Sequence, residues 1–89
     1  MTPEQRQQLR QSIIENLARQ PAVAFPADAI RRRIERSRDV DGAVGMGDVL
    51  DALAFLEGYG FAKRVRRPLS GLQDWQITSE GVAYWESNP

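Results

Sequence analysis

The segment from Met46 to Arg67, MGDVLDALAFLEGYGFAKRVRR, constrains the fold of this chain more than any other. Its apolar residues Val49, Leu53 and Leu56 recur at the three- and four-residue spacing of one helix face. This spacing predicts an amphipathic helix over about residues 46–57, with the three side chains turned toward a core.

Two glycines and a basic stretch follow that helix. Gly58 and Gly60 predict its end, because glycine adopts at little cost the left-handed backbone that terminates helices. The next residues alternate between apolar and basic, which predicts a half-buried strand near 61–67 with Phe61 and Val65 facing the core. The chain therefore passes directly from a helix into a positively charged strand.

Two further helices are predicted upstream. The first begins at Thr2, which can cap it together with Gln5, and ends at Gln20-Pro21. The second follows Phe25-Pro26 and turns Ile30 and Ile34 inward. Its outward and flanking positions carry a run of arginines.

The remaining elements are a loop, a second strand and a short last helix. Residues 39–45, DVDGAVG, form the loop before the third helix. Turn residues between Pro68 and Gly71 predict a hairpin whose second strand covers about 73–77, with Trp75 and Ile77 on its core face. A final helix starts near residues 78–80.

This order of three helices and a hairpin is similar to the winged helix-turn-helix family. Val49-x-x-Ala52-Leu53-x-x-Leu56-x-x-x-Gly60-Phe61 resembles that family's third helix entering its wing, and Ile77-Thr78-Ser79-Glu80-Gly81 resembles the "L-T-x-x-G" that follows the wing in many bacterial regulators. The length and helix spacing also resemble small winged-helix proteins of Mu-like phages. The resemblance implies an α+β, mostly α fold in which residues 1–89 form one winged-helix domain with a C-terminal hairpin wing and a short terminal helix.

Composition bears on the function classes open to the chain. It contains no cysteine and no histidine, so the usual thiolate or imidazole ligands and nucleophile–base pairs are missing. We therefore expect no enzyme, no metal site and no cofactor. The polar N-terminus and the lack of a long apolar run predict a cytoplasmic protein that does not enter a membrane.

Positive charge is concentrated although the formal net charge is zero, with 12 basic and 12 acidic residues. Nine of the 12 basic residues fall into two clusters. The wing cluster is Lys63, Arg64, Arg66 and Arg67, and the second-helix cluster is Arg31, Arg32, Arg33, Arg36 and Arg38. We expect the wing cluster to contact phosphate or lie along the minor groove, and Arg31, Arg32, Arg33 and Arg36 to hold the flanking DNA backbone. The alternative is that the helix-two arginines form only a solvated face.

The third helix conflicts with sequence-specific DNA recognition. Opposite its core face it places Asp48, Asp51 and Phe55, and it contains no lysine or arginine. We expect Asp48 to complement the helix dipole and Phe55 to be buried beneath the hairpin. The alternative leaves Phe55 exposed as an anchor for a protein.

The sequence thus predicts a DNA-binding protein, acting as a transcriptional regulator or phage-type accessory factor, that holds duplex DNA mainly by its backbone. The alternative is a protein–protein interaction module that uses Asp48, Asp51 and Phe55 without binding DNA. Its partner would be another protein, or a second copy of the chain in a homodimer.

The helical phase of residues 46–57 can be tested by stability. Leu53→Ala should lower the free energy of unfolding by about 2–5 kcal/mol, because it removes packing at the centre of the apolar stripe. Asp51→Ala, on the opposite face, should change it by roughly 0.5 kcal/mol or less. Urea melts of the two variants measure both values, and equal values would show that the phase is misassigned.

Overall fold

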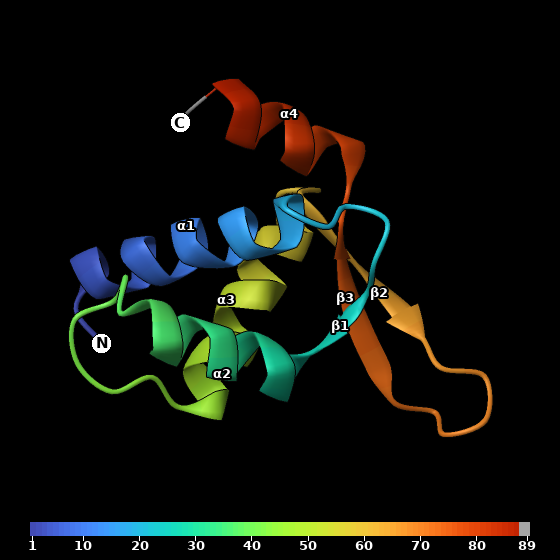
Figure 1. Ribbon diagram of the computed structural model, residues 1–89, viewed down its shortest axis with the longest axis horizontal. Helices are drawn as coiled ribbons and strands as arrows, with labels where there is room; N and C mark the ends of the chain where they lie inside the picture. Colours follow the sequence, from blue (N-terminus) through green and yellow to red (C-terminus); the bar gives the residue numbers. More distant parts are fainter. Residues whose placement is uncertain (88–89) are drawn as a thin grey trace.

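Four helices build most of the domain, and the computed structural model describes residues 1–87 (Figure 1). In chain order they are α1 (Pro3–Ala18), α2 (Ala27–Ser37), α3 (Met46–Gly58) and α4 (Ser79–Ser87). The first three pack against one another around a shared core, and α4 packs on α1. Each lies within one or two residues of its predicted position.

A small antiparallel sheet forms the rest of the fold. Its strands are β1 (Phe25–Pro26), β2 (Ala62–Arg66) and β3 (Gln73–Ile77), in the order β1-β3-β2. The β2–β3 hairpin extends away from the helices as a wing (Figure 1). This arrangement confirms the predicted α+β winged-helix fold, whereas the two-residue strand β1 was not predicted. Pro26 has no N–H to donate, so β1 suits the edge of the sheet.

The start of α1 is capped as predicted. The Gln5 backbone N–H donates to the Thr2 hydroxyl at 3.1 Å, and the Thr2 N–H donates to the Gln5 side-chain oxygen at 2.9 Å. These reciprocal bonds satisfy donors that would otherwise lack partners at the helix end. The Gln5 amide also donates to the Asp41 carbonyl at 2.8 Å, so the cap holds the α2–α3 loop as well.

The loop between α2 and α3 is longer than the turn of an ordinary helix-turn-helix. It begins at Arg38, which has a left-handed backbone (φ 55°). Val40 and Val44 are buried and attach the loop to the core. The Asp39 carboxylate accepts a hydrogen bond from the Ser12 hydroxyl at 3.2 Å, which ties the loop to α1.

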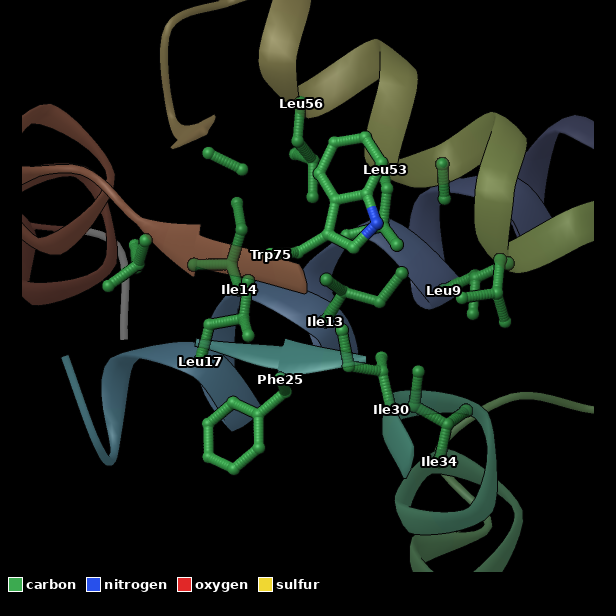
Figure 2. Close-up of a cluster of buried hydrophobic side chains, with 14 of the residues drawn as sticks. Leu9, Ile13, Ile14, Leu17, Phe25, Ile30, Ile34, Leu53, Leu56 and Trp75 are labelled. Atoms are coloured by element: carbon green, nitrogen blue, oxygen red, sulfur yellow. The ribbon is translucent and has the colours of Figure 1, made fainter. Parts of the chain in front are cut away.

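The core lies where the helices meet the sheet. Val49 and Leu53 of α3 are fully buried, as the spacing predicts. Trp75 of β3 is also buried, and its indole points toward Leu53 and Leu56 of α3 (Figure 2). The wing is therefore rooted in the same core that holds the helices together.

The predicted alternation of the first wing strand is wrong by one residue. In the register of the hairpin, Ala62 pairs with Ile77 and Val65 pairs with Asp74. Paired residues share a face of the sheet, so Ala62 joins the buried face while half-buried Val65 lies on the opposite one. Burial of Trp75 and Ile77 sets this phase.

The junction between β3 and α4 explains the final glycine of the ITSEG motif. The Thr78 hydroxyl donates to the Gly60 carbonyl at 2.6 Å and accepts from the Gly81 N–H at 3.0 Å. Gly81 is buried, and a Cβ there would collide with the Phe61 carbonyl oxygen and lie 2.6 Å from Cγ1 of Ile77. The motif thus fixes α4 against the turn that follows α3.

Two glycine-to-alanine changes should have opposite effects. Gly81→Ala should lower the free energy of unfolding by about 1–3 kcal/mol or more, because the backbone must move to relieve the collision. Gly47→Ala, on an open helical position of α3, should raise it by about 0.5–1 kcal/mol through helix propensity. Denaturant melts compare them, and a tolerated Gly81→Ala would contradict this packing.

Candidate nucleic-acid interface

The four basic residues of the wing divide between the two faces of the hairpin. Because side chains alternate along a strand, Arg64 and Arg66 lie on the face that contains Trp75. Lys63 lies on the opposite face, and Arg67 follows directly after β2. The wing therefore does not present its charge as a single row.

Arg64 connects the wing to the end of α3. Its Nε donates to both carboxylate oxygens of Glu57, at 3.1 and 2.9 Å, and its Nη1 donates to the Gln73 side chain at 3.0 Å. Its guanidinium also lies 4.9 Å from the centre of the Trp75 ring. The charge of Arg64, predicted to contact DNA, is therefore paired within the domain.

Arg67 clamps the two strands at the base of the wing tip. Its Nε and Nη2 donate to Oδ1 of Asp74 at 2.9 and 2.7 Å. The hydrogen bond to Asp74 raises the pKa of Arg67, because it favours the charged guanidinium. The Asp74 side chain is only 16% exposed, and its charge is balanced by Arg67.

Lys63 and Arg66 are the free cations of the wing. Both are exposed, and neither forms an ion pair with another residue of the described range 1–87. The wing thus carries two uncompensated positive charges rather than the four that the sequence suggests.

The arginines of α2 are also partly engaged. Arg31 pairs with Glu35 at 2.8 Å, and Arg32 pairs with Asp28 at 3.4 Å. The Arg33 guanidinium lies 4.2 Å from the centre of the Phe25 ring. Arg36 is exposed and, like Arg38 after it, has no ion pair within residues 1–87. Exposed pairs four residues apart on a helix stabilise by only about 0.3–0.5 kcal/mol, so Arg31 and Arg32 can exchange their carboxylates for phosphate.

The acidic residues of α3 are placed differently from the prediction. The Asp48 carboxylate accepts the Gly45 N–H at 3.0 Å, which confirms its expected role at the start of the helix. However, Asp48 and Asp51 line a hollow of about 330 Å³ between α1 and α3, where they face Arg6 and Arg10. The expectation that Asp48 occupies the outward, base-facing side of α3 is therefore wrong, because half-buried Asp48 lies on the flank that turns toward α1. Asp51, at the edge of the same hollow, remains exposed.

The outward surface of α3 offers no hydrogen-bond donor from a side chain. Its exposed residues are Gly47, Leu50, Asp51, Ala54, Phe55 and Gly58. Recognition of bases usually relies on donors such as arginine, lysine, asparagine or glutamine. In the structure, as in the sequence, the helix expected to recognise bases therefore lacks the side chains that would do so.

The expectation that Phe55 is buried beneath the hairpin is wrong. Its side chain is 40% exposed, and the Arg10 guanidinium of α1 lies 3.4 Å from the ring centre. The space under the wing is filled by Trp75 and Ile77, and the last turn of α3 directs Phe55 toward α1 instead. Phe55 and exposed Tyr59, with ring centres 5.0 Å apart, border a groove of about 280 Å³ between α1, α3 and α4.

Two contacts of this region were not predicted from the sequence. The sequence contains a pattern from which the Glu57–Arg64 ion pair could have been predicted, since opposite charges flank the Gly58–Gly60 turn. The Arg10–Phe55 contact has no such pattern, because it joins helices that are distant in the sequence.

Other classes of site find no support among residues 1–87. The described part contains no group of three acidic, cysteine or histidine residues placed to hold a metal ion. Within the same range, no helix is both long enough and apolar enough to cross a membrane.

Comparisons with known proteins agree with the fold. No protein-family model matches the chain, and no curated protein matches it in sequence. A solved structure of a transcriptional regulator from Clostridium thermocellum is similar, with a TM-score of 0.72 and 20% sequence identity. The match covers 98% of this chain and 82% of the regulator. The likeness shows a shared fold, while the resemblance to proteins of Mu-like phages stays a prediction.

Proposed function

We propose that this protein binds duplex DNA, mainly through the phosphate backbone, and acts in transcriptional control. The observation that carries the proposal is the pair of exposed, unpaired cations Lys63 and Arg66 on a wing that projects from the helices. The fold is shared with a protein described as a transcriptional regulator, which adds support. Cytoplasmic location and a phage-type accessory role are parts of the proposal that rest on the sequence alone.

In this mechanism the backbone contacts provide affinity without reading sequence. Lys63 and Arg66 neutralise phosphates beside the wing, and Arg36 and Arg38 do so along the flanking backbone. Arg31, Arg32 and Arg33, which are already engaged within the domain, support that backbone contact without adding to the count of neutralised phosphates. Arg64 and Arg67 position the wing through Glu57 and Asp74. The donor-free surface of α3 adds little discrimination between bases.

A salt titration tests the proposal directly. Four exposed cations in the two clusters lack an ion pair within residues 1–87, namely Lys63, Arg66, Arg36 and Arg38. If all four reach phosphates, log K against log salt should have a slope of roughly −3.6 for random duplex DNA. Fluorescence anisotropy measures it, and a folded protein that binds no duplex at low salt would refute the proposal.

The contribution of the wing cations to DNA binding can be distinguished from the effect of overall charge. Lys63→Ala combined with Arg66→Ala should make the salt slope less negative by about 1.8 and weaken binding equally across unrelated sequences. Arg6→Ala combined with Arg19→Ala removes the same charge from α1 and should leave the slope near that of the wild type. Equal losses in both double variants would indicate attraction by net charge alone.

Releasing Arg64 should strengthen binding. Glu57→Gln removes a carboxylate beside the wing and frees the Arg64 guanidinium, so the salt slope should become more negative by about 0.9. Glu15→Gln, which frees Arg19 at the end of α1, is the matched control and should have no such effect. If Glu57→Gln binds no better than Glu15→Gln, the end of α3 lies away from the duplex.

The groove beside Phe55 favours a second candidate function, binding of an acidic protein segment. Its walls contain Arg10, Gln7 and Gln11 as donors and no carboxylate, while Phe55 and Tyr59 provide exposed aromatic surface. The buried Nε of Arg10 has no hydrogen-bond partner. In this proposal Arg10 replaces Asp48 and Asp51 as the charged contact beside Phe55. If the folded wild-type protein binds no duplex DNA at low salt, this candidate is favoured.

A further inference from the structure

The tip of the wing exposes two leucines, and within residues 1–87 nothing covers the side chain of Leu69. Leu69 is fully exposed, at 102% relative accessibility, and Leu72 is 57% exposed. Both lie between the end of β2 and the start of β3. This turn is at the end of the hairpin that points away from the helices (Figure 1). Folding therefore gains nothing from the side chain of Leu69, although leucine burial is favourable wherever a partner provides it.

The tip is held in shape by its own bonds. The Arg67 N–H donates to the Leu72 carbonyl at 2.8 Å, and the Gly71 N–H donates to the Arg67 carbonyl at 3.3 Å. Gly71 has a left-handed backbone (φ 69°). The Arg67–Asp74 pair clamps the strands directly behind the turn. The wing thus presents Leu69 on a closed turn at its end.

The surroundings of the tip are positive. Residues 66–73, RRPLSGLQ, contain no acidic side chain. Arg66 at the base of the tip is exposed and without an ion pair in residues 1–87. The neighbouring carboxylate, Asp74, is already neutralised by Arg67. An apolar tip with a cationic flank complements a polyanion that has an apolar interior.

We infer that Leu69 is a wedge that enters the minor groove and partly unstacks a base step, with Leu72 supporting it. This inference rests on the proposed DNA binding. Apolar side chains such as leucine are used in this way by proteins that kink duplexes, while basic residues hold the adjacent phosphates. Arg66 is placed to make that phosphate contact.

A wedge gives this domain a way to select DNA that α3 does not supply. Pyrimidine–purine steps such as TA and CA are the most easily unstacked, so they favour a protein that must open a step. Selection then follows the deformability of the duplex rather than the pattern of base edges. The ligand class is duplex DNA containing flexible or mismatched steps.

The experiment compares two duplexes of equal length, one with central TA steps and one whose first strand contains only purines and so has no pyrimidine–purine step. Wild-type protein should bind the TA duplex about tenfold more tightly, because unstacking is easier there. A 2-aminopurine placed beside the TA step should brighten on binding. Leu69→Ser should bind both duplexes equally, without the brightening, and should retain the wild-type salt slope.

Val23→Ser is the matched control, since Val23 is a 43% exposed apolar residue of the α1–β1 loop. It should behave as the wild type. Equal binding of both duplexes by wild-type protein, or an unchanged signal in Leu69→Ser, would overturn the wedge while leaving DNA binding intact. Failure to bind either duplex would overturn both proposals. Leu69-dependent binding to anionic phosphatidylglycerol vesicles, with no selection between duplexes, would assign the tip to a lipid surface instead.

Discussion

Burial of Trp75 is the interaction on which the geometry of the wing depends. Its strand lies between β1 and β2, so Trp75 pairs with Phe25 on one side and with Arg64 on the other. The indole is 4% exposed and points into the core toward α3 (Figure 2). A large aromatic group in this position fixes the register of the hairpin, because a slip of one residue would move it to the opposite face.

The position of Trp75 also determines which charges remain free. Because Trp75 fixes the register, the Arg64 guanidinium lies over the Trp75 ring and within hydrogen-bonding distance of Glu57. The same register sets Asp74 where Arg67 can bind it across the strands. Two of the four wing cations are thereby used to hold the wing, and Lys63 and Arg66 are left for a partner. A chain of zero net charge can in this way still present a local positive surface.

The wing matters for the proposed DNA binding because the exposed surface of α3 lacks hydrogen-bond donors. Exposed glycine, alanine and leucine residues cannot donate hydrogen bonds to base edges, and Asp51 accepts only. Of the acids on this helix, Asp48 is engaged at its start, Asp51 lines a hollow with the arginines of α1, and Glu57 pairs with Arg64 of the wing. The hairpin combines two uncompensated cations, Lys63 and Arg66, with the most exposed apolar side chain, Leu69. Both proposals for DNA therefore concern the wing rather than the helix that usually reads the bases.

The sequence by itself determined the helices, the hairpin and the core. Spacing of Val49 and Leu53, the Thr2–Gln5 cap and the glycines after α3 act over a few residues, so local patterns suffice to predict them. Tertiary structure alone decided the exposure of Phe55 and the existence of β1, and it selected Glu57 from the nearby carboxylates as the partner of Arg64. These depend on which surfaces meet in space, because burial and ion pairing are set by neighbours from distant parts of the chain. For that reason the sequence located the basic clusters, and only the fold showed which of their charges are free.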